Sequence, residues 1–160
     1  MTIKIGDKLP DGTLYEMSEE GPKPVSVTEL TAGKRIVIFG LPGAFTPTCS
    51  ALHVPGYVAQ ADRITAKGID QIVCVAVNDA FVMGAWGKEQ KVGGKVRMLG
   101  DGSGLWTKAL GLELDLVAKG LGMRCERFSM LVDNGVVQSL NVEAPGKFEV
   151  SDAQSMLNSL

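Results

Sequence analysis

A cysteine stands at the predicted start of a helix, where a thiol can become reactive. The stretch from Pro42 to Cys49 reads Pro-Gly-Ala-Phe-Thr-Pro-Thr-Cys and follows an apolar run. Thr46 is a favourable N-cap and Pro47 a favourable first helical residue, so we expect Cys49 to be the third residue of the helix. The helix dipole favours a thiolate there, but it contributes only about 0.3–1 kcal/mol, and one pKa unit requires about 1.4 kcal/mol. A reactive Cys49 therefore needs a nearby cation.

Two other residues of this stretch suit the same chemistry. Thr46 and Cys49 are three residues apart and share a helix face, so the hydroxyl can hydrogen-bond the sulfur or an oxygen beside it. Pro42 has no N–H group and shields one side of the site without competing for hydrogen bonds. A buried and inert thiol remains an equal alternative from position alone, because free cysteines are among the most buried residues.

The elements around Cys49 predict a parallel pair of strands. Residues 35–41 and 71–77 are short apolar runs rich in Val and Ile, which is typical of strands covered on both faces. The helix that begins at Thr46 and ends at Lys67-Gly68 connects them, so the crossover is expected to be right-handed. Cys49 then lies at the carboxyl end of a strand, where ligands of open α/β sheets bind.

The remaining elements complete an α/β pattern. Asp133-Asn134-Gly135 predicts a hairpin between strands at 126–132 and 136–142. The other expected elements are a helix from Asn78-Asp79 to about Lys91, a strand at 96–99, a short helix at 105–110 and a last helix from Ser151-Asp152. Gly21-Pro22-Lys23-Pro24 is interpreted as a surface loop. We predict a thioredoxin-like fold, with a central mixed β-sheet flanked by helices.

Composition limits the class of protein. The chain has 160 residues, which suits a single domain over 1–160, and its net charge of −2 gives no basic field for nucleic acid or an anionic membrane. No apolar stretch approaches the roughly 18 residues that span a bilayer, and the start lacks a secretory pattern. Three cysteines are an odd number without tight spacing, which indicates a reducing compartment. We expect a cytoplasmic protein, unless a presequence has been removed.

The Pro-x-x-x-Thr-x-x-Cys pattern of residues 42–49 resembles the peroxidatic motif of peroxiredoxins, and residues 50–57 resemble the type II, or Prx5-like, branch. The resemblance continues through 77–83, Ala85-Trp86 and 127–135. It implies a thioredoxin fold and thiol peroxidase activity, with Cys49 as the nucleophile that attacks the peroxide O–O bond. It also assigns three further site residues: Pro42, Thr46 and Arg127.

The resemblance makes Arg127 the cation that Cys49 needs. Without the motif, a solvated charge on a strand would be the favoured interpretation, since most arginines are exposed. A guanidinium and the Thr46 hydroxyl can stabilise the charge that develops on the leaving oxygen, and this chemistry requires no metal or organic cofactor. Arg124 is a nearby competitor, but in a regular strand it would point to the opposite face from Arg127.

A second thiol is needed to condense with the sulfenic acid that attack leaves on Cys49. Cys74 matches the resolving position of many type II members. A disulfide requires Cα atoms within about 7 Å, so we expect local unfolding around Cys49 in each turnover. The alternative is a packed Cys74, with glutathione or a glutaredoxin attacking the sulfenic acid directly. Cys125 shares a predicted strand face with Arg127 and could lie near the pocket; a small core or surface residue is the favoured interpretation, and a disulfide to it stays open.

Several other residues are interpreted as structural. His53, the only histidine, lies one helical turn after Cys49, but no third group orients it as in a Cys/His protease, and the resemblance makes it part of the helix surroundings. Met83 and Trp86 form the inward stripe of the second helix, as core or subunit contact. The glycines at 100, 102 and 104 do not match dinucleotide spacing, so nucleotide binding has no support.

The sequence therefore predicts a thiol-dependent peroxidase for hydrogen peroxide and alkyl hydroperoxides, recycled by thioredoxin, glutaredoxin or glutathione. The alternative is a peroxide sensor that relays its oxidation to a partner protein through the same residues. A general thiol-disulfide oxidoreductase is disfavoured, because Thr46 stands where Cys-x-x-Cys requires a cysteine. The family commonly forms homodimers, and Phe45, Phe81 and Trp86 are the expected apolar contributors.

Overall fold

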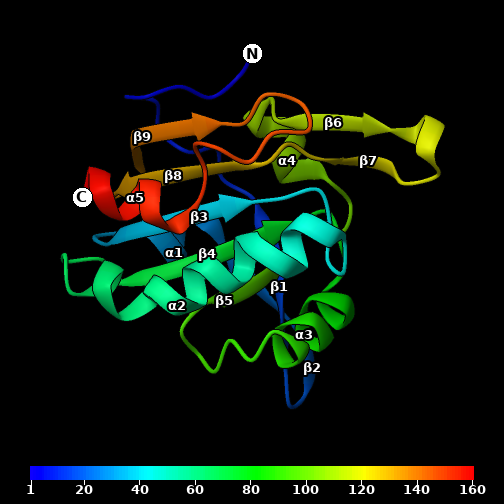
Figure 1. The fold of residues 1–160 in the computed structure, drawn as a ribbon, viewed down its shortest axis with the longest axis horizontal. Helices are drawn as coiled ribbons and strands as arrows, with labels where there is room; N and C mark the ends of the chain where they lie inside the picture. The colour runs from blue at the N-terminus through cyan, green and yellow to red at the C-terminus, as the bar shows by residue number, and fades with distance from the viewer.

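A seven-stranded mixed sheet runs through the centre of the computed structural model, which covers residues 1–160, in the order β2-β1-β5-β4-β3-β8-β9 (Figure 1). Its strands are β1 (Thr13–Ser18), β2 (Gly21–Ser26), β3 (Arg35–Gly40), β4 (Gln71–Ala76), β5 (Arg97–Gly100), β8 (Phe128–Asp133) and β9 (Val136–Val142). Two further strands, β6 (Glu113–Leu116) and β7 (Gly122–Cys125), form an antiparallel arm that projects from the body.

The three middle strands are parallel and the outer ones antiparallel. β3 pairs in parallel with β4, and β4 with β5, whereas β8 pairs antiparallel with β3 and with β9. Residues 36–41 and 72–76 are buried, because helices cover both faces of this part of the sheet. The predicted parallel pair and the predicted thioredoxin-like α/β fold are confirmed.

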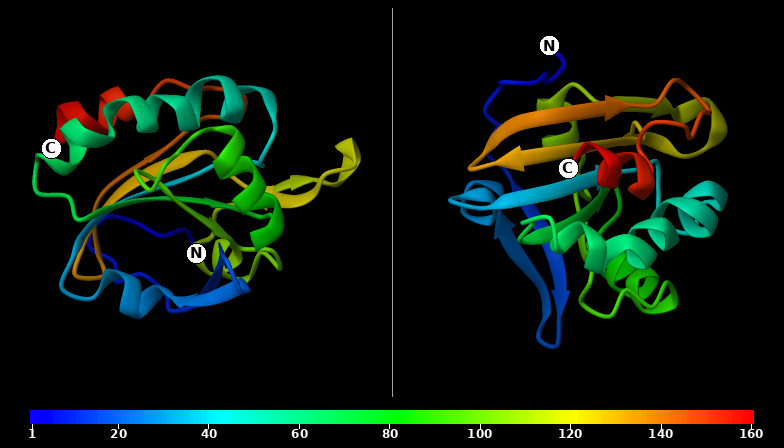
Figure 2. Two further views of the ribbon diagram at one scale, coloured as in Figure 1. Left: turned by 90° about the horizontal axis from the view of Figure 1, so that it is seen from below. Right: turned by 60° about the vertical axis from the view of Figure 1, so that its left-hand side comes forward.

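The helices divide into two layers (Figure 2). Their bounds are α1 (Val27–Thr31), α2 (Val54–Thr65), α3 (Ala80–Glu89), α4 (Leu105–Leu110) and α5 (Ala153–Ser159), with a π-helical segment, Cys49–His53, before α2 and a 3-10 turn at Val117–Lys119. Side chains of α2, α3 and α5 pack into one apolar core, and those of α1 and α4 pack into a second core on the opposite face. The sheet therefore separates two cores. No helix has the length and apolar character needed to cross a membrane.

The predicted hairpin around Asn134-Gly135 is confirmed. Asn134 and Gly135 have φ angles of 48° and 80°, and positive φ at both central residues is typical of the tight turns that join antiparallel strands. The first strand begins at Phe128, two residues later than expected. Glu126 and Arg127 consequently lie between β7 and β8, outside both strands.

The interpretation of Gly21-Pro22-Lys23-Pro24 as a loop is wrong. These residues begin β2, which pairs with β1, and the turn falls at Glu19-Glu20 instead. β2 is the edge strand of the sheet. A proline lacks the N–H that a central strand must donate, but on an edge one side of the strand needs no partner, so prolines are tolerated there.

Candidate active site

The helix that carries Cys49 begins as predicted. Residues 47–65 are helical, and the N–H of Ser50 donates to the carbonyl of Thr46 at 2.9 Å, so Cys49 is the third helical residue. The segment Cys49–His53 is π-helical, and the N–H of Val54 donates to the carbonyl of Cys49. Single π-helical turns inside α-helices occur frequently at functional sites, because they re-aim side chains at the cost of regular hydrogen bonding.

Arg127 meets the sulfur of Cys49. Its Nη2 donates to Cys49 Sγ at 3.2 Å, and its Nη1 donates to His53 Nδ1 at 2.9 Å. Cys49 is fully buried, so water does not compete with the guanidinium for hydrogen bonds to the sulfur. The structure thus brings together the cysteine and the cation that were expected to act together.

His53 is held as a neutral ring with both nitrogens engaged. Because an arginine can only donate, Nδ1 accepts from Arg127 and the proton lies on Nε2, which donates to the carbonyl of Ser151 at 3.1 Å. Burial, together with the positive charge of Arg127, lowers the pKa of His53 from 6.5 to about 3. The ring cannot take a proton from Cys49, so the rejection of a Cys/His protease agrees with this geometry.

The loop before the helix is fastened by residues from distant elements. Arg124 Nη1 donates to the carbonyl of Pro42 at 3.1 Å, and the N–H of Ala44 donates to Asn78 Oδ1 at 2.9 Å. Phe45 has a φ of 64°, in the left-handed region that a bulky residue rarely adopts, so these bonds hold a strained backbone. Arg124, the competitor of Arg127, therefore supports the loop and is not bonded to the sulfur.

Thr46 does not make the first of its two expected hydrogen bonds, the one from its hydroxyl to the sulfur of Cys49. Its hydroxyl donates to the carbonyl of Gly43 at 2.7 Å, so the hydroxyl proton is not directed at the sulfur. The lone pairs of Oγ1 are still able to accept a hydrogen bond. The expectation that remains is the second, a bond to an oxygen placed beside Cys49.

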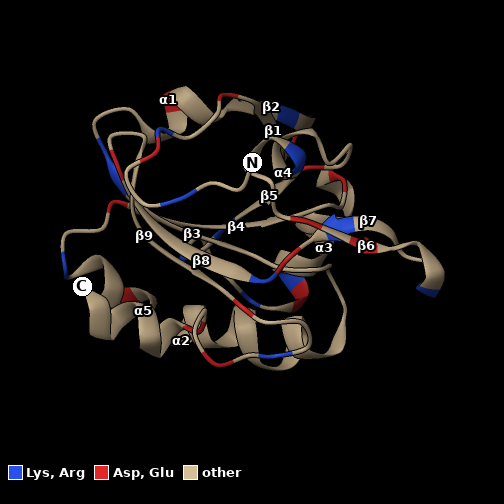
Figure 3. Ribbon diagram, turned by 90° about the horizontal axis from the view of Figure 1, so that it is seen from above, with Lys and Arg blue, Asp and Glu red and all other residues tan.

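A cavity of about 310 Å³ lies against this site. Its walls include Pro42 and Arg127, together with Leu116, Lys119, Glu143 and Phe148. The β6-β7 arm forms one side, and acidic and basic residues lie beside one another along it (Figure 3). Two of the four expected site residues thus face one hollow. No group of three His, Cys, Asp or Glu side chains is placed to hold a metal ion.

The other two cysteines lie on opposite faces of the sheet. Cys74 is fully buried in the same core as Cys49, and burial raises the pKa of its thiol well above the ordinary value. Cys125 packs into the second core, where burial likewise raises its pKa. The less favoured alternative, a position near the pocket, does not hold, since Arg127 lies outside the strand and the two-residue alternation does not extend to it. The favoured interpretation, a small core residue, is confirmed.

Some residues of the site had no signal in the sequence. Asn78 was expected only as part of a helix cap, and Ser151 only as part of the start of the last helix. Their contacts with the loop and with His53 join residues 34 and 98 positions apart in the chain. No local spacing reports such a contact.

Comparison with known proteins agrees with this site. The Redoxin family model matches residues 4–157. Peroxiredoxin-2C of Oryza sativa subsp. japonica is 52% identical over 159 residues, covering 99% of this chain and 98% of the relative. The crystal structure of reduced Prx3 from Vibrio vulnificus in complex with H2O2 is 51% identical, covers 99% of each chain and superimposes with a TM-score of 0.95. A Burkholderia cenocepacia structure, described as a thioredoxin reductase, is 59% identical and covers 100% of this chain and 99% of its own, with a TM-score of 0.97.

The chain belongs to the Redoxin family, which its full-length match and its thioredoxin-like fold together define. Within that family it is a type II, Prx5-like peroxiredoxin, and its activity is that of a thiol peroxidase.

The neutral His53 predicts a specific pH dependence of stability. The unfolded chain binds a proton at His53 as the pH falls below 6.5, whereas the folded chain does not until about pH 3, so folding loses stability in that window. Between about pH 6 and pH 5 we expect the wild type to lose about 1 kcal/mol more unfolding free energy than His53→Gln, a neutral replacement with one donor and one acceptor. Urea unfolding at several pH values measures both; equal slopes would contradict a neutral His53.

Proposed function

We propose that Cys49 is the peroxidatic residue and that Arg127 stabilises its reaction. The observation that carries this proposal is the 3.2 Å contact between Arg127 Nη2 and Cys49 Sγ beside the cavity. The thiolate attacks one peroxide oxygen and the O–O bond breaks. The electron pair leaves with the other oxygen, which takes a proton. Sulfur is oxidised to a sulfenic acid, and the peroxide is reduced to water or an alcohol.

Arg127, Thr46 and Pro42 have separate roles in this step. The guanidinium of Arg127 favours the thiolate beforehand and the leaving oxygen during reaction, with donors already fixed in place. The lone pairs of Thr46 Oγ1 accept from the O–H of the bound peroxide, since its own proton is held by Gly43. Pro42, at the cavity wall, excludes water without offering a donor.

Hydrogen peroxide and small alkyl hydroperoxides are the proposed substrates. The cavity beside Arg127, of about 310 Å³, has room for a short alkyl chain as well as for the peroxide itself. A relative at 51% identity is described in complex with H2O2, which supports a peroxide as the ligand of this site.

Substitution of the two central residues tests the mechanism. We expect Cys49→Ser to abolish rapid peroxide reduction, and Arg127→Lys, which keeps a charge but loses the guanidinium fork, to slow it by about 10²–10³-fold. Single-turnover stopped-flow with tryptophan fluorescence measures the rate. Arg63→Lys, at an exposed position on α2, is the matched control and is expected to react at the wild-type rate. A fast reaction in Cys49→Ser would place the chemistry elsewhere.

Cys74 is the proposed resolving residue. It shares a core with Cys49, but both thiols are free and buried, and the raised pKa of Cys74 keeps it protonated in the folded state. Condensation therefore requires Cys49–His53 to unwind, which brings the sulfenic acid to Cys74 and frees that thiol to ionise. Thioredoxin, a glutaredoxin or glutathione then returns the disulfide to two thiols. Three free cysteines support a reducing, cytoplasmic location.

Removal of Cys74 tests this resolving role. We expect wild-type protein treated with one equivalent of peroxide to lose the mass of two hydrogens, and Cys74→Ser to gain the mass of one oxygen instead. Intact-mass spectrometry after quenching measures the difference. Cys125→Ser, which removes a thiol from the opposite core, is the control and is expected to behave like the wild type. Unchanged turnover of Cys74→Ser with every reductant would show that an external thiol resolves Cys49.

A homodimer is proposed through the face that carries Phe45 and Phe81. Their side chains are 53% and 60% exposed, which is unusual for phenylalanine unless a partner covers them. Trp86 was expected in the same contact but is fully buried, and its Nε1 donates to Ser50 Oγ, so that expectation is wrong. Trp86 contributes to the core.

Sedimentation measures this assembly. We expect wild type to sediment as a dimer at micromolar concentration and Phe81→Glu to sediment as a monomer, because a buried unpaired carboxylate opposes association. Ile5→Glu is a control matched in exposure, at 61%, and is expected to remain dimeric. A monomeric wild type would remove the proposal.

A further inference from the structure

We propose that Glu143 is a positioning residue for Arg127, fixing its main chain directly and its guanidinium through Ser151 and His53. The inference rests on the proposed function of Cys49 and Arg127, which it deepens. Glu143 directly follows β9, the strand that pairs with β8, and it lies opposite Arg127, which directly precedes β8. Its side chain is only 7% exposed, and nothing in the peroxidase chemistry itself requires a buried carboxylate there.

The main chain of Glu143 holds the main chain of Arg127. The last pair of the β8-β9 ladder is Phe128 with Val142, and one residue further the N–H of Glu143 donates to the carbonyl of Arg127 at 2.9 Å. This bond extends the ladder beyond the end of β8. The backbone from which the guanidinium projects is thereby fixed, although Arg127 lies outside any strand.

The carboxylate of Glu143 binds the segment that leads into α5. It accepts from the N–H groups of Glu149, Val150 and Ser151 at 2.8–2.9 Å, and from the Ser151 hydroxyl at 2.7 Å. Partial burial raises the pKa of Glu143, but the Ser151 hydroxyl and the three N–H groups outweigh it, so the pKa lies below its ordinary value. The group is a charged acceptor for four donors, a strong arrangement for holding a loop.

Ser151 passes this constraint to the catalytic arginine. Its carbonyl accepts from His53 Nε2 at 3.1 Å and from the Tyr57 hydroxyl at 3.0 Å. His53 Nδ1 in turn accepts from Arg127 Nη1 at 2.9 Å, while Nη2 of the same guanidinium bonds Cys49. If the Ser151 peptide moves, the imidazole loses the acceptor that sets its tautomer and orientation, and the guanidinium loses its fixed acceptor.

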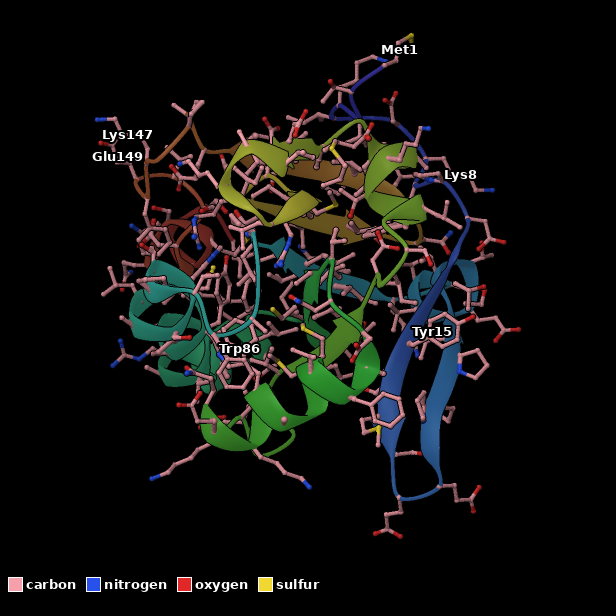
Figure 4. The ribbon with its side chains drawn as sticks, turned by 90° about the vertical axis from the view of Figure 1, so that its right-hand side faces the viewer. Met1, Lys8, Tyr15, Trp86, Lys147 and Glu149 are labelled. Carbon is pink, nitrogen blue, oxygen red and sulfur yellow. The ribbon has the colours of Figure 1, made fainter.

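The loop between Glu143 and Ser151 also covers the site. The ring of Phe148 lies 5.0 Å from the His53 ring and 5.6 Å from Cζ of Arg127, within the range of a cation–π contact. Lys147 and Glu149, on either side of Phe148, instead point outward to solvent (Figure 4). We call the Glu143 carboxylate and its four donors the carboxylate clamp. By holding this loop, the clamp places the Phe148 ring on the guanidinium, while the side chains of Lys147 and Glu149 remain in solvent.

The first test compares the rate of peroxide reduction in Glu143→Gln and Glu149→Gln. Both variants lose one negative charge from the same region, but Glu149 is exposed and its carboxylate holds nothing. We expect Glu143→Gln to react with hydrogen peroxide about 10–100-fold more slowly, because small misplacements of a catalytic group produce losses of this order. Glu149→Gln is expected to retain the wild-type rate. An unchanged rate in folded Glu143→Gln would overturn the proposal.

The second test separates positioning from simple stabilisation. His53 is the only histidine, so its two ring nitrogens give the only imidazole signals in a 15N NMR spectrum. The charged groups acting on it are Arg127, Glu143 and Asp152. We expect wild type and Glu149→Gln to show the neutral Nε2–H form from pH 7.5 to pH 5. Glu143→Gln is expected to show mixed Nδ1–H and Nε2–H tautomers in the same range, with the ring still neutral, because the Glu143 charge raises the pKa of His53 and its loss does not favour protonation. A purely structural role would leave the spectrum of the folded variant unchanged.

The NMR readout also distinguishes failure of this proposal from failure of the proposed function. If wild type lacks fast peroxide reduction, the peroxidase assignment of Cys49 fails, but the spectrum still reports whether Glu143 orients His53. If Glu143→Gln does not fold, Ser151→Ala removes only the 2.7 Å hydroxyl bond to the carboxylate. A smaller loss of rate with the same change in the imidazole signals is then expected, and a wild-type rate and spectrum in Ser151→Ala would overturn the clamp.

Discussion

The contact between the Arg127 guanidinium and the buried sulfur of Cys49 is the constraint on which the rest of the site depends. The guanidinium is half-buried and directs two of its donors at acceptors in the protein, Cys49 Sγ and His53 Nδ1. A charge withdrawn from water needs such partners, because an unpaired buried charge is strongly destabilising. Sheet topology brings the two residues together: β3 leads into the Cys49 loop, and β8 pairs with β3 so that Phe128 lies opposite Gly40. A side chain on Gly40 would overlap the Phe128 ring, so a glycine is needed for this close pairing.

Buried polar groups surround this contact, and each of them has hydrogen-bond partners. His53 is neutral and bonded at both nitrogens, and the Ser151 carbonyl takes two donors. Such a network is rigid when it is complete, and the loss of one member is costly, because it leaves a buried polar group without one of its hydrogen bonds. The proposed roles of Cys49, attack followed by release towards Cys74, suit a short π-helical segment, whose hydrogen bonding is less favourable than that of a regular helix.

Two interpretations of the sequence that the structure does not bear out have physical reasons. Gly21-Pro22-Lys23-Pro24 has the composition of a loop, and only the position of β2 at the sheet edge makes its missing donors harmless. A position of Cys125 near the pocket was the alternative that counting in twos along a strand left open, but β7 ends at Cys125 and Arg127 lies outside both strands. Alternation holds only while the backbone stays extended, so it carries no information across that break.

The sequence by itself determined the thioredoxin-like α/β pattern, the Asn134-Gly135 turn and the place of Cys49 at the third position of its helix. These features follow from apolar periodicity, caps and turn residues, which act between residues close in the chain. The family motif added Arg127, 78 positions from Cys49, but not what holds it. Only the tertiary structure decided that His53, Ser151 and Glu143 connect to that guanidinium, since hydrogen bonds between residues 74 and 98 positions apart depend on how strands and loops are brought together in space.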